Sequence, residues 1–244
     1  MAMINDIGLL VEKQFKNRKS FTTKELLSFM EKWKPAVSAS TYIWTIHRLL
    51  QEDIIHPLKK GVYTLEKKSR FNPEIDNTLK SIYSNIKNEF PYIDFCVWES
   101  RFVDSFMQHL TKNHFIIVDV EKDVMESVYY SLRDKFPQVF NNPDSTLVED
   151  YISDLDRPIV IRRLISESPL METQGIISAS IEKILVDIFD SVDFFYLQGN
   201  ELTHVYSNIF ERYTINESRL YRYASRKGKK EKIQKFVGTI KNKA

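Results

Sequence analysis

Three alternating carboxylates are the residues of this chain best suited to chemistry. Asp119, Glu121 and Asp123 lie at and just beyond the end of the apolar run 114–120, which has the composition of a buried strand. Alternate carboxylates at a strand end can hold magnesium in nucleases and nucleotidyltransferases. A metal-dependent nuclease or nucleotidyltransferase that uses these three residues is therefore one hypothesis for the function.

The residues around the carboxylates argue against this hypothesis. A nucleotidyltransferase would carry a Gly-Ser turn upstream, which is missing, and a restriction-type nuclease would carry a Glu-x-Lys motif, whereas Lys122 directly follows Glu121. Asp123 is also well placed to cap a helix expected over 123–136. We therefore predict no metal site and no enzymatic activity.

The other reactive side chains form no recognisable site. The histidines show no short metal-ligand spacing; they are His47, His56, His109, His114 and His204. Cys96 is the single cysteine and lies in the apolar run 93–98, so we expect a small buried side chain and no disulfide. The chain has 6 glycines and no phosphate-binding glycine motif. We therefore predict that the protein uses no cofactor.

Charge is distributed unevenly along the 244 residues. Residues 1–70 carry 13 Lys and Arg against 7 Asp and Glu, residues 216–244 carry 10 against 2, and the segment between them carries 12 against 24. A basic end can bind a polyanion, and a solvated lysine-rich surface explains the C-terminal end equally well. The N-terminus lacks a secretory signal and no apolar run reaches about 20 residues, so we expect a cytoplasmic protein with no membrane contact.

The N-terminal residues are predicted to form three helices in succession. Apolar residues at helical spacing predict a first helix over 4–15. Thr22 and Glu25 have the spacing of a capping box, which starts a second helix. Pro35 ends that helix, and Ser38 can cap a third one after a short turn.

A hairpin is expected after the third helix. Two β-prone runs within 54–65 flank a turn made of Lys59, Lys60 and Gly61. Three helices followed by a basic hairpin predict a winged helix-turn-helix domain over 1–68. In such a domain the third helix enters the major groove of DNA and the lysines of the wing reach phosphates.

The third helix is expected to have one apolar and one polar face. The residues predicted to face the core are Ile43, Ile46, Leu49 and Leu50. The opposite face is polar, aromatic and basic, and the residues predicted to bind operator DNA are Ser38, Ser40, Thr41, Trp44, Thr45 and Arg48, together with Lys59 and Lys60 of the hairpin.

A second domain, 73–244, is predicted after a charged linker over 67–73. Its first half alternates helices, expected over 74–90, 100–110 and 123–136, with strands, expected over 92–98, 114–120 and 158–162. Beyond residue 178 four apolar stripes predict four helices and no further strand. The predicted fold class is α/β, in which the N-terminal winged helix-turn-helix is followed by a mixed α/β domain that ends in a four-helix bundle.

Four segments of the C-terminal half resemble the AbiEi family: SIEKILVD (180–187), YSNIFERY (206–213), INESRL (215–220) and YASRKG (223–228). The resemblance covers 178–228 and extends to the N-terminal domain in architecture. Members of this family are antitoxins of abortive-infection, type IV toxin–antitoxin systems. The resemblance implies that the protein represses its own operon and counteracts a partner toxin of the nucleotidyltransferase class.

The charged residues in these segments need no catalytic explanation. Glu182 and Lys183 lie beside an apolar stripe and are expected to pair with neighbouring helices. Asn216 and Gly228 are expected to begin and end a helix.

Basic residues also recur on one face of that helix. Arg219, Arg222 and Arg226 have spacings of three and four, and Lys227 follows them. This face could bind an acidic partner or phosphates, or serve solubility alone, and these four residues are our candidate partner-binding residues. The sequence as a whole favours a DNA-binding regulator and antitoxin, with the metal-dependent enzyme and a pure interaction protein as alternatives.

Overall fold

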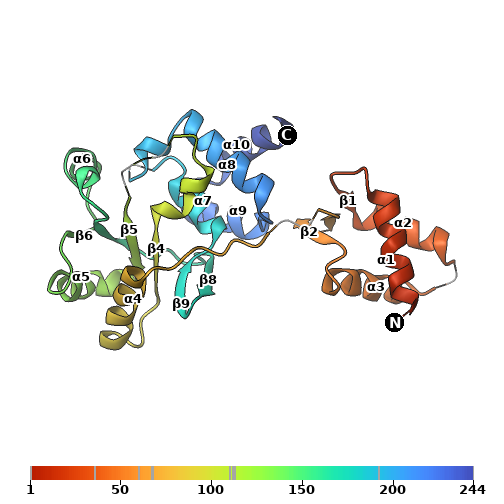
Figure 1. Ribbon diagram of the computed structural model, residues 1–244, viewed down its shortest axis with the longest axis horizontal. Helices are drawn as coiled ribbons and strands as arrows, with labels where there is room; N and C mark the ends of the chain where they lie inside the picture. The colour runs from red at the N-terminus through yellow and green to blue at the C-terminus, as the bar shows by residue number, and fades with distance from the viewer. Residues whose placement is uncertain are drawn as a thin grey trace. The chain divides into compact units, whose positions relative to one another are not determined.

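A computed structural model describes residues 2–35, 37–59, 61–66, 69–109, 111, 114–191 and 193–243 (Figure 1). The chain divides into two compact units. The first comprises Met1–Arg70 with Arg212–Ser218, and the second comprises Phe71–Glu211 with Arg219–Ala244. The division after residue 70 lies inside the segment expected to be a linker.

The first unit contains three helices and three short strands in its described residues. The helices are α1 (Ala2–Phe15), α2 (Thr23–Trp33) and α3 (Ala39–Gln51). The strands are β1 (Phe21–Thr22), β2 (His56–Lys59) and β3 (Val62–Thr64), and they form an antiparallel sheet in the order β1-β3-β2. The three helices and the hairpin that the sequence predicts are present, and β1 is an additional strand.

Side-chain caps start α2 and α3, as predicted. Thr22 Oγ1 accepts a hydrogen bond from Glu25 N at 3.2 Å, and Glu25 Oε2 accepts one from Thr22 N at 2.7 Å. Because Thr22 also ends β1, the chain passes directly from strand to helix. Ser38 Oγ accepts from Thr41 N at 3.3 Å at the start of α3. Each cap satisfies backbone N–H groups that the first helical turn leaves without a partner.

The buried face of α3 differs from the prediction at one position. Tyr42, Ile46 and Leu49 are buried, whereas Ile43 is 51% exposed. The Tyr42 hydroxyl donates to the carbonyl oxygen of Lys34 at 2.8 Å, so the ring fills the core and its polar end is satisfied. The assignment of Ile43 to the core was therefore wrong, because one position along a helix rotates a side chain by about 100°.

The second unit is a larger α/β structure. Its helices are α4 (Asn77–Glu89), η1 (Ser100–Phe106), η2 (Lys122–Val124), α5 (Met125–Arg133), α6 (Ser145–Asp150), η3 (Ile152–Asp154), α7 (Ile181–Ile188), η4 (Phe195–Leu197), α8 (Asn200–Arg212), α9 (Glu217–Arg226) and α10 (Lys230–Lys243). Its strands are β4 (Phe95–Glu99), β5 (Ile116–Val120), β6 (Val139–Asn141), β7 (Ile159–Arg163), β8 (Leu170–Thr173) and β9 (Ile176–Ala179). Among the described residues, no helix has the length and apolar character needed to span a membrane.

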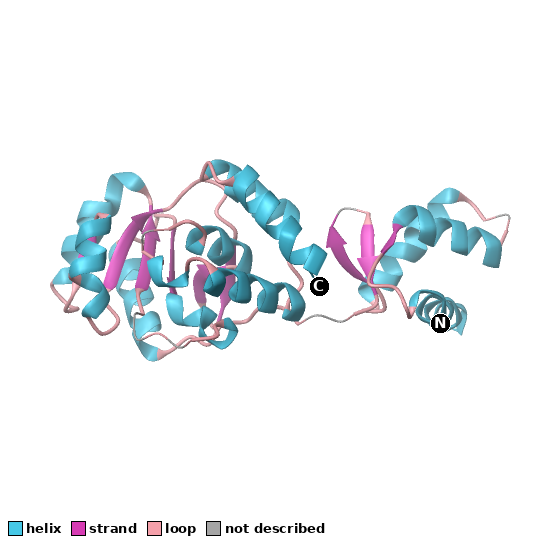
Figure 2. Ribbon diagram, turned by 90° about the horizontal axis from the view of Figure 1, so that it is seen from above, coloured by secondary structure: helices cyan, strands magenta, loops and turns pink. Residues whose placement is uncertain are grey.

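The central sheet of the second unit has the strand order β4-β5-β7-β6. β4 is antiparallel to β5, and β5, β7 and β6 run parallel. All residues of β4 and β5 are buried, as expected of strands that are covered on both faces (Figure 2). One face packs against α4 and α5 in an apolar core that includes Ile82 of α4, Leu132 of α5, and Val118 and Ile161 of the sheet.

The opposite face of the sheet packs against α7. All eight residues of α7 are buried, because α8 and α9 cover the sides that the sheet leaves open. Tyr206 of α8 donates its hydroxyl to the carbonyl oxygen of Leu185 at 2.5 Å, and Tyr223 of α9 donates to Asp187 at 2.9 Å. The four helices predicted for the C-terminal part are thus present, with α7 enclosed between the sheet and its partners.

Several elements of the second unit depart from the prediction. β6, α6 and the β8–β9 hairpin were not expected, and 100–106 forms a 3-10 helix instead of an α-helix. β9 ends at Ala179, and among the described residues no further strand follows it, in line with the prediction that strands end near residue 178. Gln174 (φ 48) and Gly175 (φ 82) form the two-residue turn of this hairpin. A Gln-Gly pair between two short runs is a weaker hairpin signal than Asn-Gly, and four-residue strands show little alternation.

Candidate nucleic-acid interface

One side of α3 carries the residues predicted to bind DNA. Ser40, Thr41 and Trp44 are exposed, and Thr45 and Arg48 are half-buried. The buried residues of α3 occupy the other side of the helix, where they join the core of the first unit. The structure therefore places the predicted α3 residues on a common face that water can reach.

Hydroxyl groups gather at the first turn of α3. Ser38 Oγ lies 2.8 Å from Ser40 Oγ and 2.9 Å from Thr41 Oγ1. Thr45 Oγ1 donates to the carbonyl oxygen of Thr41 at 2.8 Å. A hydroxyl can donate and accept, so these groups retain capacity for a base edge or a phosphate. The first N–H groups of the helix lie beside them and favour an anion.

Arg48 contacts two neighbours, Trp44 within α3 and Glu52 at the C-terminal end of the helix. Its guanidinium carbon lies 5.0 Å from the centre of the Trp44 ring, and Nη2 lies 2.7 Å from Glu52 Oε1. The sequence places no acidic residue on this helix before Glu52, yet this carboxylate reaches back to Arg48. The charge of Arg48 is therefore partly balanced within the protein, and its guanidinium packs against the indole.

The turn of the β2–β3 hairpin is attached to the start of α2. Gly61 has φ 74, a conformation that glycine adopts without strain. Its carbonyl oxygen accepts hydrogen bonds from Thr23 N at 2.9 Å and from Thr23 Oγ1 at 3.2 Å. Lys59 is the last residue of β2, and Lys60 lies outside the described residues. The anchored glycine positions the end of this hairpin relative to α2.

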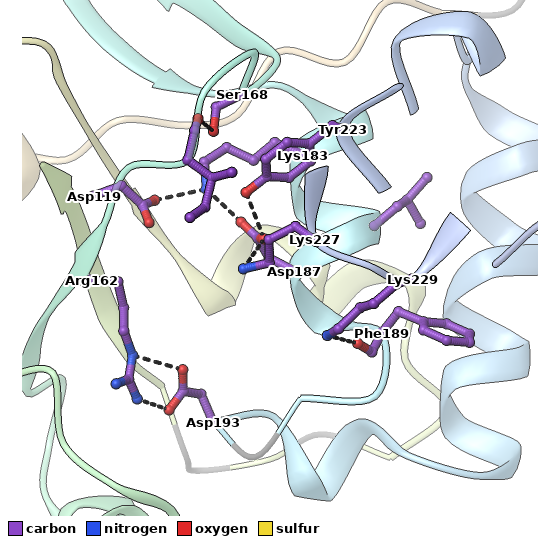
Figure 3. Close-up of polar contacts among 12 residues, drawn as sticks. Asp119, Arg162, Ser168, Lys183, Asp187, Phe189, Asp193, Tyr223, Lys227 and Lys229 are labelled. Atoms are coloured by element: carbon purple, nitrogen blue, oxygen red, sulfur yellow. Dashed lines mark hydrogen bonds and ion pairs between the residues drawn. The ribbon is translucent and has the colours of Figure 1, made fainter. Parts of the chain in front are cut away.

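The second unit contains a buried cluster of charges centred on Lys183 (Figure 3). Lys183 is fully buried, and its Nζ lies 2.8 Å from Asp119 Oδ2 and 2.5 Å from Asp187 Oδ2. Asp187 Oδ1 accepts from the Tyr223 hydroxyl at 2.9 Å and lies 3.2 Å from Lys227 Nζ. We call Asp119, Lys183, Asp187, Tyr223 and Lys227 the Lys183 cluster.

The Lys183 cluster joins the sheet to two helices. Asp119 lies on β5, where Oδ2 also accepts from Trp98 Nε1 of β4 at 2.8 Å. Two lysines face two aspartates, so the charges balance. Burial lowers the pKa of Lys183, but the two carboxylates outweigh this effect and hold it well above the ordinary value. Lys183 therefore stays an ammonium group and cannot act as a base or nucleophile at neutral pH.

The sequence contains a signal for this cluster beyond the pairing with neighbouring helices that it predicts for Lys183. Lys183 follows Glu182 in a helix whose other residues before Asp187 are apolar, and Asp187 lies four residues after Lys183. A charge inside an apolar stripe needs a buried counter-charge. The partner on the sheet, Asp119, could not be inferred from spacing.

The candidate metal ligands at the end of β5 have other partners. Asp119 contacts Lys183, and Glu121 Oε1 accepts from Asp94 N at 2.6 Å. Within the described ranges no three His, Cys, Asp or Glu side chains gather in a way that could hold a metal ion. The capping role expected for Asp123 was wrong, because it lies inside η2, and neither η2 nor α5 has a side-chain cap.

The candidate partner-binding residues of α9 do not form one exposed stripe. Arg219 is half-buried and donates to the carbonyl oxygen of Leu170 at 3.1 Å. Arg226 is exposed and pairs with Glu167 at 2.7 Å, and Arg222 is exposed on the same helix. Lys227 points instead into the Lys183 cluster. Only part of the predicted basic face thus remains on the surface.

Cys96 is fully buried, as predicted, and burial together with nearby carboxylates raises the pKa of its thiol well above the ordinary value. This cysteine therefore remains a thiol and contributes packing between β4 and α7.

Comparison with known proteins relates both units to one family. No curated protein matches the chain. A family model matches residues 41–243, a range that runs from α3 of the first unit to the end of α10 and covers most of the chain. The chain therefore belongs to DUF6577, a family of unknown function.

Proposed function

We propose that the protein is a DNA-binding transcriptional regulator whose first unit is a winged helix-turn-helix. In this proposal α3 is the recognition helix and the β2–β3 hairpin is the wing. The observation that carries it is the exposed face of α3, on which hydroxyl, indole and guanidinium groups lie together. The segment 38–51 contains no acidic residue, so nothing within it repels the phosphates that flank a groove.

The charge of the N-terminal segment supports a polyanionic partner. Residues 1–70 carry 13 Lys and Arg against 7 Asp and Glu. Cations that replace the counterions of DNA release those ions, which drives binding and makes the affinity fall with salt. Operator DNA is therefore the partner proposed for this unit.

We assign the second unit to the antitoxin role that the AbiEi resemblance implies. The protein then represses its own operon from the cytoplasm and counteracts a toxin of the nucleotidyltransferase class. The resembling segments lie on α7, α8 and α9, the three helices that pack around the Lys183 cluster. A lysine held as an ammonium group and a paired Asp119 favour a scaffold over an enzyme.

The DNA-binding proposal is tested with the full-length protein by fluorescence anisotropy across a salt series. Arg48→Ala combined with Lys59→Ala and Lys60→Ala should weaken binding to duplex DNA and flatten its salt dependence. The control removes two exposed lysines of α10, Lys230 and Lys235, and should lose much less affinity. Equal binding by wild type and the triple variant would exclude this surface.

The antitoxin proposal is tested by co-expression with a nucleotidyltransferase-like toxin encoded beside the protein's gene. Charge reversal of the two exposed α9 residues, Arg222→Glu with Arg226→Glu, should reduce growth rescue while operator binding stays intact. Rescue that follows DNA binding across all variants would show that neutralisation runs through repression and would reject a separate antitoxin surface.

A further inference from the structure

The first unit exposes two adjacent large apolar side chains on α3. Ile43 is 51% exposed and Trp44 is 54% exposed. They lie between Ser40 and His47, which are also exposed, so the pair interrupts a polar helix face. Burial of these side chains against a partner would be favourable, and the rest of the first unit does not provide it.

The side chains of Ile43 and Trp44 have little conformational freedom. Ile43 is β-branched, and in a helix such a side chain has one strongly preferred rotamer. The Arg48 guanidinium lies 5.0 Å from the Trp44 ring centre and is itself held by Glu52 at 2.7 Å. A chain of contacts from Glu52 through Arg48 therefore orients the indole. Preorganised side chains lose little entropy when they bind.

Building on the proposed DNA-binding function, we infer that α3 recognises thymine-containing sequences through Ile43 and Trp44. The major groove displays one apolar group, the 5-methyl of thymine. An exposed aliphatic and aromatic pair on a recognition helix is the complement of that methyl. Arg48 is partly neutralised by Glu52 and packs against Trp44, so it orients the indole, and methyl recognition adds to the sequence preference that Arg48 and Thr45 supply.

A protein partner fits these observations less well. Two side chains bury at most a few hundred Å², whereas a stable protein interface needs about 800 Å² on each side. The excess of Lys and Arg over Asp and Glu in residues 1–70 also complements a polyanion. The groove of duplex DNA accepts a narrow apolar contact beside a basic side chain, which is the arrangement of Ile43 and Trp44 with Arg48 on α3.

The test compares thymine with deoxyuridine, which lacks only the 5-methyl group. The full-length protein first selects its preferred site from a random-sequence duplex pool. The selected duplex is then prepared twice, with every thymine present or with every thymine replaced by deoxyuridine. Removing a buried methyl should weaken binding about fourfold for each thymine that is contacted.

Two single variants test whether Ile43 and Trp44 cause the discrimination between thymine and deoxyuridine. Ile43→Ala and Trp44→Ala should bind the thymine and deoxyuridine duplexes with nearly equal affinity. Leu9→Ala removes another exposed apolar side chain of the same unit, 65% exposed on α1, and should keep the wild-type discrimination. Because all three side chains are exposed, the melting temperatures of the variants, measured by circular dichroism, should match that of the wild type.

The possible outcomes separate this inference from the function on which it rests. No binding to any duplex would reject the DNA-binding function itself. Specific binding that is equal for thymine and deoxyuridine would reject methyl recognition and leave the DNA-binding function standing. Discrimination that survives in Ile43→Ala and Trp44→Ala would reject these two residues. Loss of self-association in these variants, seen by sedimentation, with unchanged discrimination would identify the face as a protein interface.

Discussion

Two regions of the molecule use the same side-chain chemistry in opposite environments. On α3, Arg48 lies 5.0 Å from the ring centre of Trp44 and pairs with Glu52 four residues later. On α7, Lys183 lies 5.5 Å from the ring centre of Trp98 and pairs with Asp187 four residues later. The first arrangement lies at the surface, and the second is buried.

The difference in burial decides what each arrangement can do. Water competes for the charges of Arg48 and Glu52, so their pairing is weak and a phosphate or base can replace one partner. Lys183, Asp119 and Asp187 have left water, and the other members of the cluster together with Trp98 compensate their charges. A surface pair can therefore serve recognition, whereas the buried cluster holds β5, α7 and α9 together.

The largest expected effect is loss of stability when the buried cluster is broken. Lys183→Met leaves Asp119 and Asp187 buried with Lys227 as the remaining cation of the cluster, which should cost about 3–5 kcal/mol of unfolding free energy. Urea denaturation followed by tryptophan fluorescence measures this change.

A double variant tests whether uncompensated charge is the cause. Asp119→Asn with Lys183→Met removes one anion and one cation, and Asp187 keeps Lys227 at 3.2 Å. The double variant should be less destabilised than the sum of the two single variants. If the losses of unfolding free energy in the two single variants simply add up in the double variant, the electrostatic explanation is contradicted.

Variants of the proposed wing and recognition helix should have separable effects on DNA binding. Lys59→Ala with Lys60→Ala should weaken binding to all sequences alike and reduce the slope of log affinity against log salt by about 2. Arg48→Ala and Thr45→Ala should instead reduce the preference for the selected site over a scrambled duplex. Anisotropy titrations on both duplexes distinguish the patterns, and an unchanged salt slope in the lysine variant would remove the hairpin from the interface.

The stability that the buried cluster contributes should also depend on pH. Burial raises the pKa of Asp187, but Lys183 and Lys227 outweigh this and lower it below the ordinary value. A carboxyl group whose pKa is lowered on folding contributes stability above its unfolded pKa of about 3.9, and this contribution is lost as pH falls through the folded value.

The stability difference between wild type and Asp187→Asn should thus stay constant from about pH 5 to 8 and narrow below about pH 4. Urea midpoints measured across this range give the difference directly. A difference that already vanishes between pH 5 and 7 would be inconsistent with a depressed pKa.

The smallest expected effect belongs to the surface pair. Glu52→Gln should change unfolding free energy by no more than about 1 kcal/mol, since exposed ion pairs contribute little. The same change releases the Arg48 guanidinium, so affinity for DNA should rise by roughly twofold to fivefold. Paired urea and anisotropy measurements test both expectations, and weaker binding would show that Glu52 is needed to orient Arg48.

Features that depend on neighbouring residues were predictable from the sequence. The capping box of Thr22 and Glu25, the Ser38 cap and the strands β4, β5 and β7 all follow from short patterns. The turn after α9 is another case, since Gly228 has φ 68, the left-handed conformation expected at a helix end. Such features form wherever the local chain is compatible, because they need few distant contacts.

Features that depend on distant contacts were decided by the tertiary structure. Tyr42 and Ile43 are adjacent on α3, and either could have faced the core. The fold buries Tyr42, whose hydroxyl reaches the carbonyl oxygen of Lys34, and leaves Ile43 exposed. The sequence made Asp119 a candidate metal ligand, whereas the packing of α7 against β5 pairs its carboxylate with the Lys183 ammonium group. Periodicity determines that a helix has an inner face, but only the complete fold determines its orientation and the counter-charge that each buried ion meets.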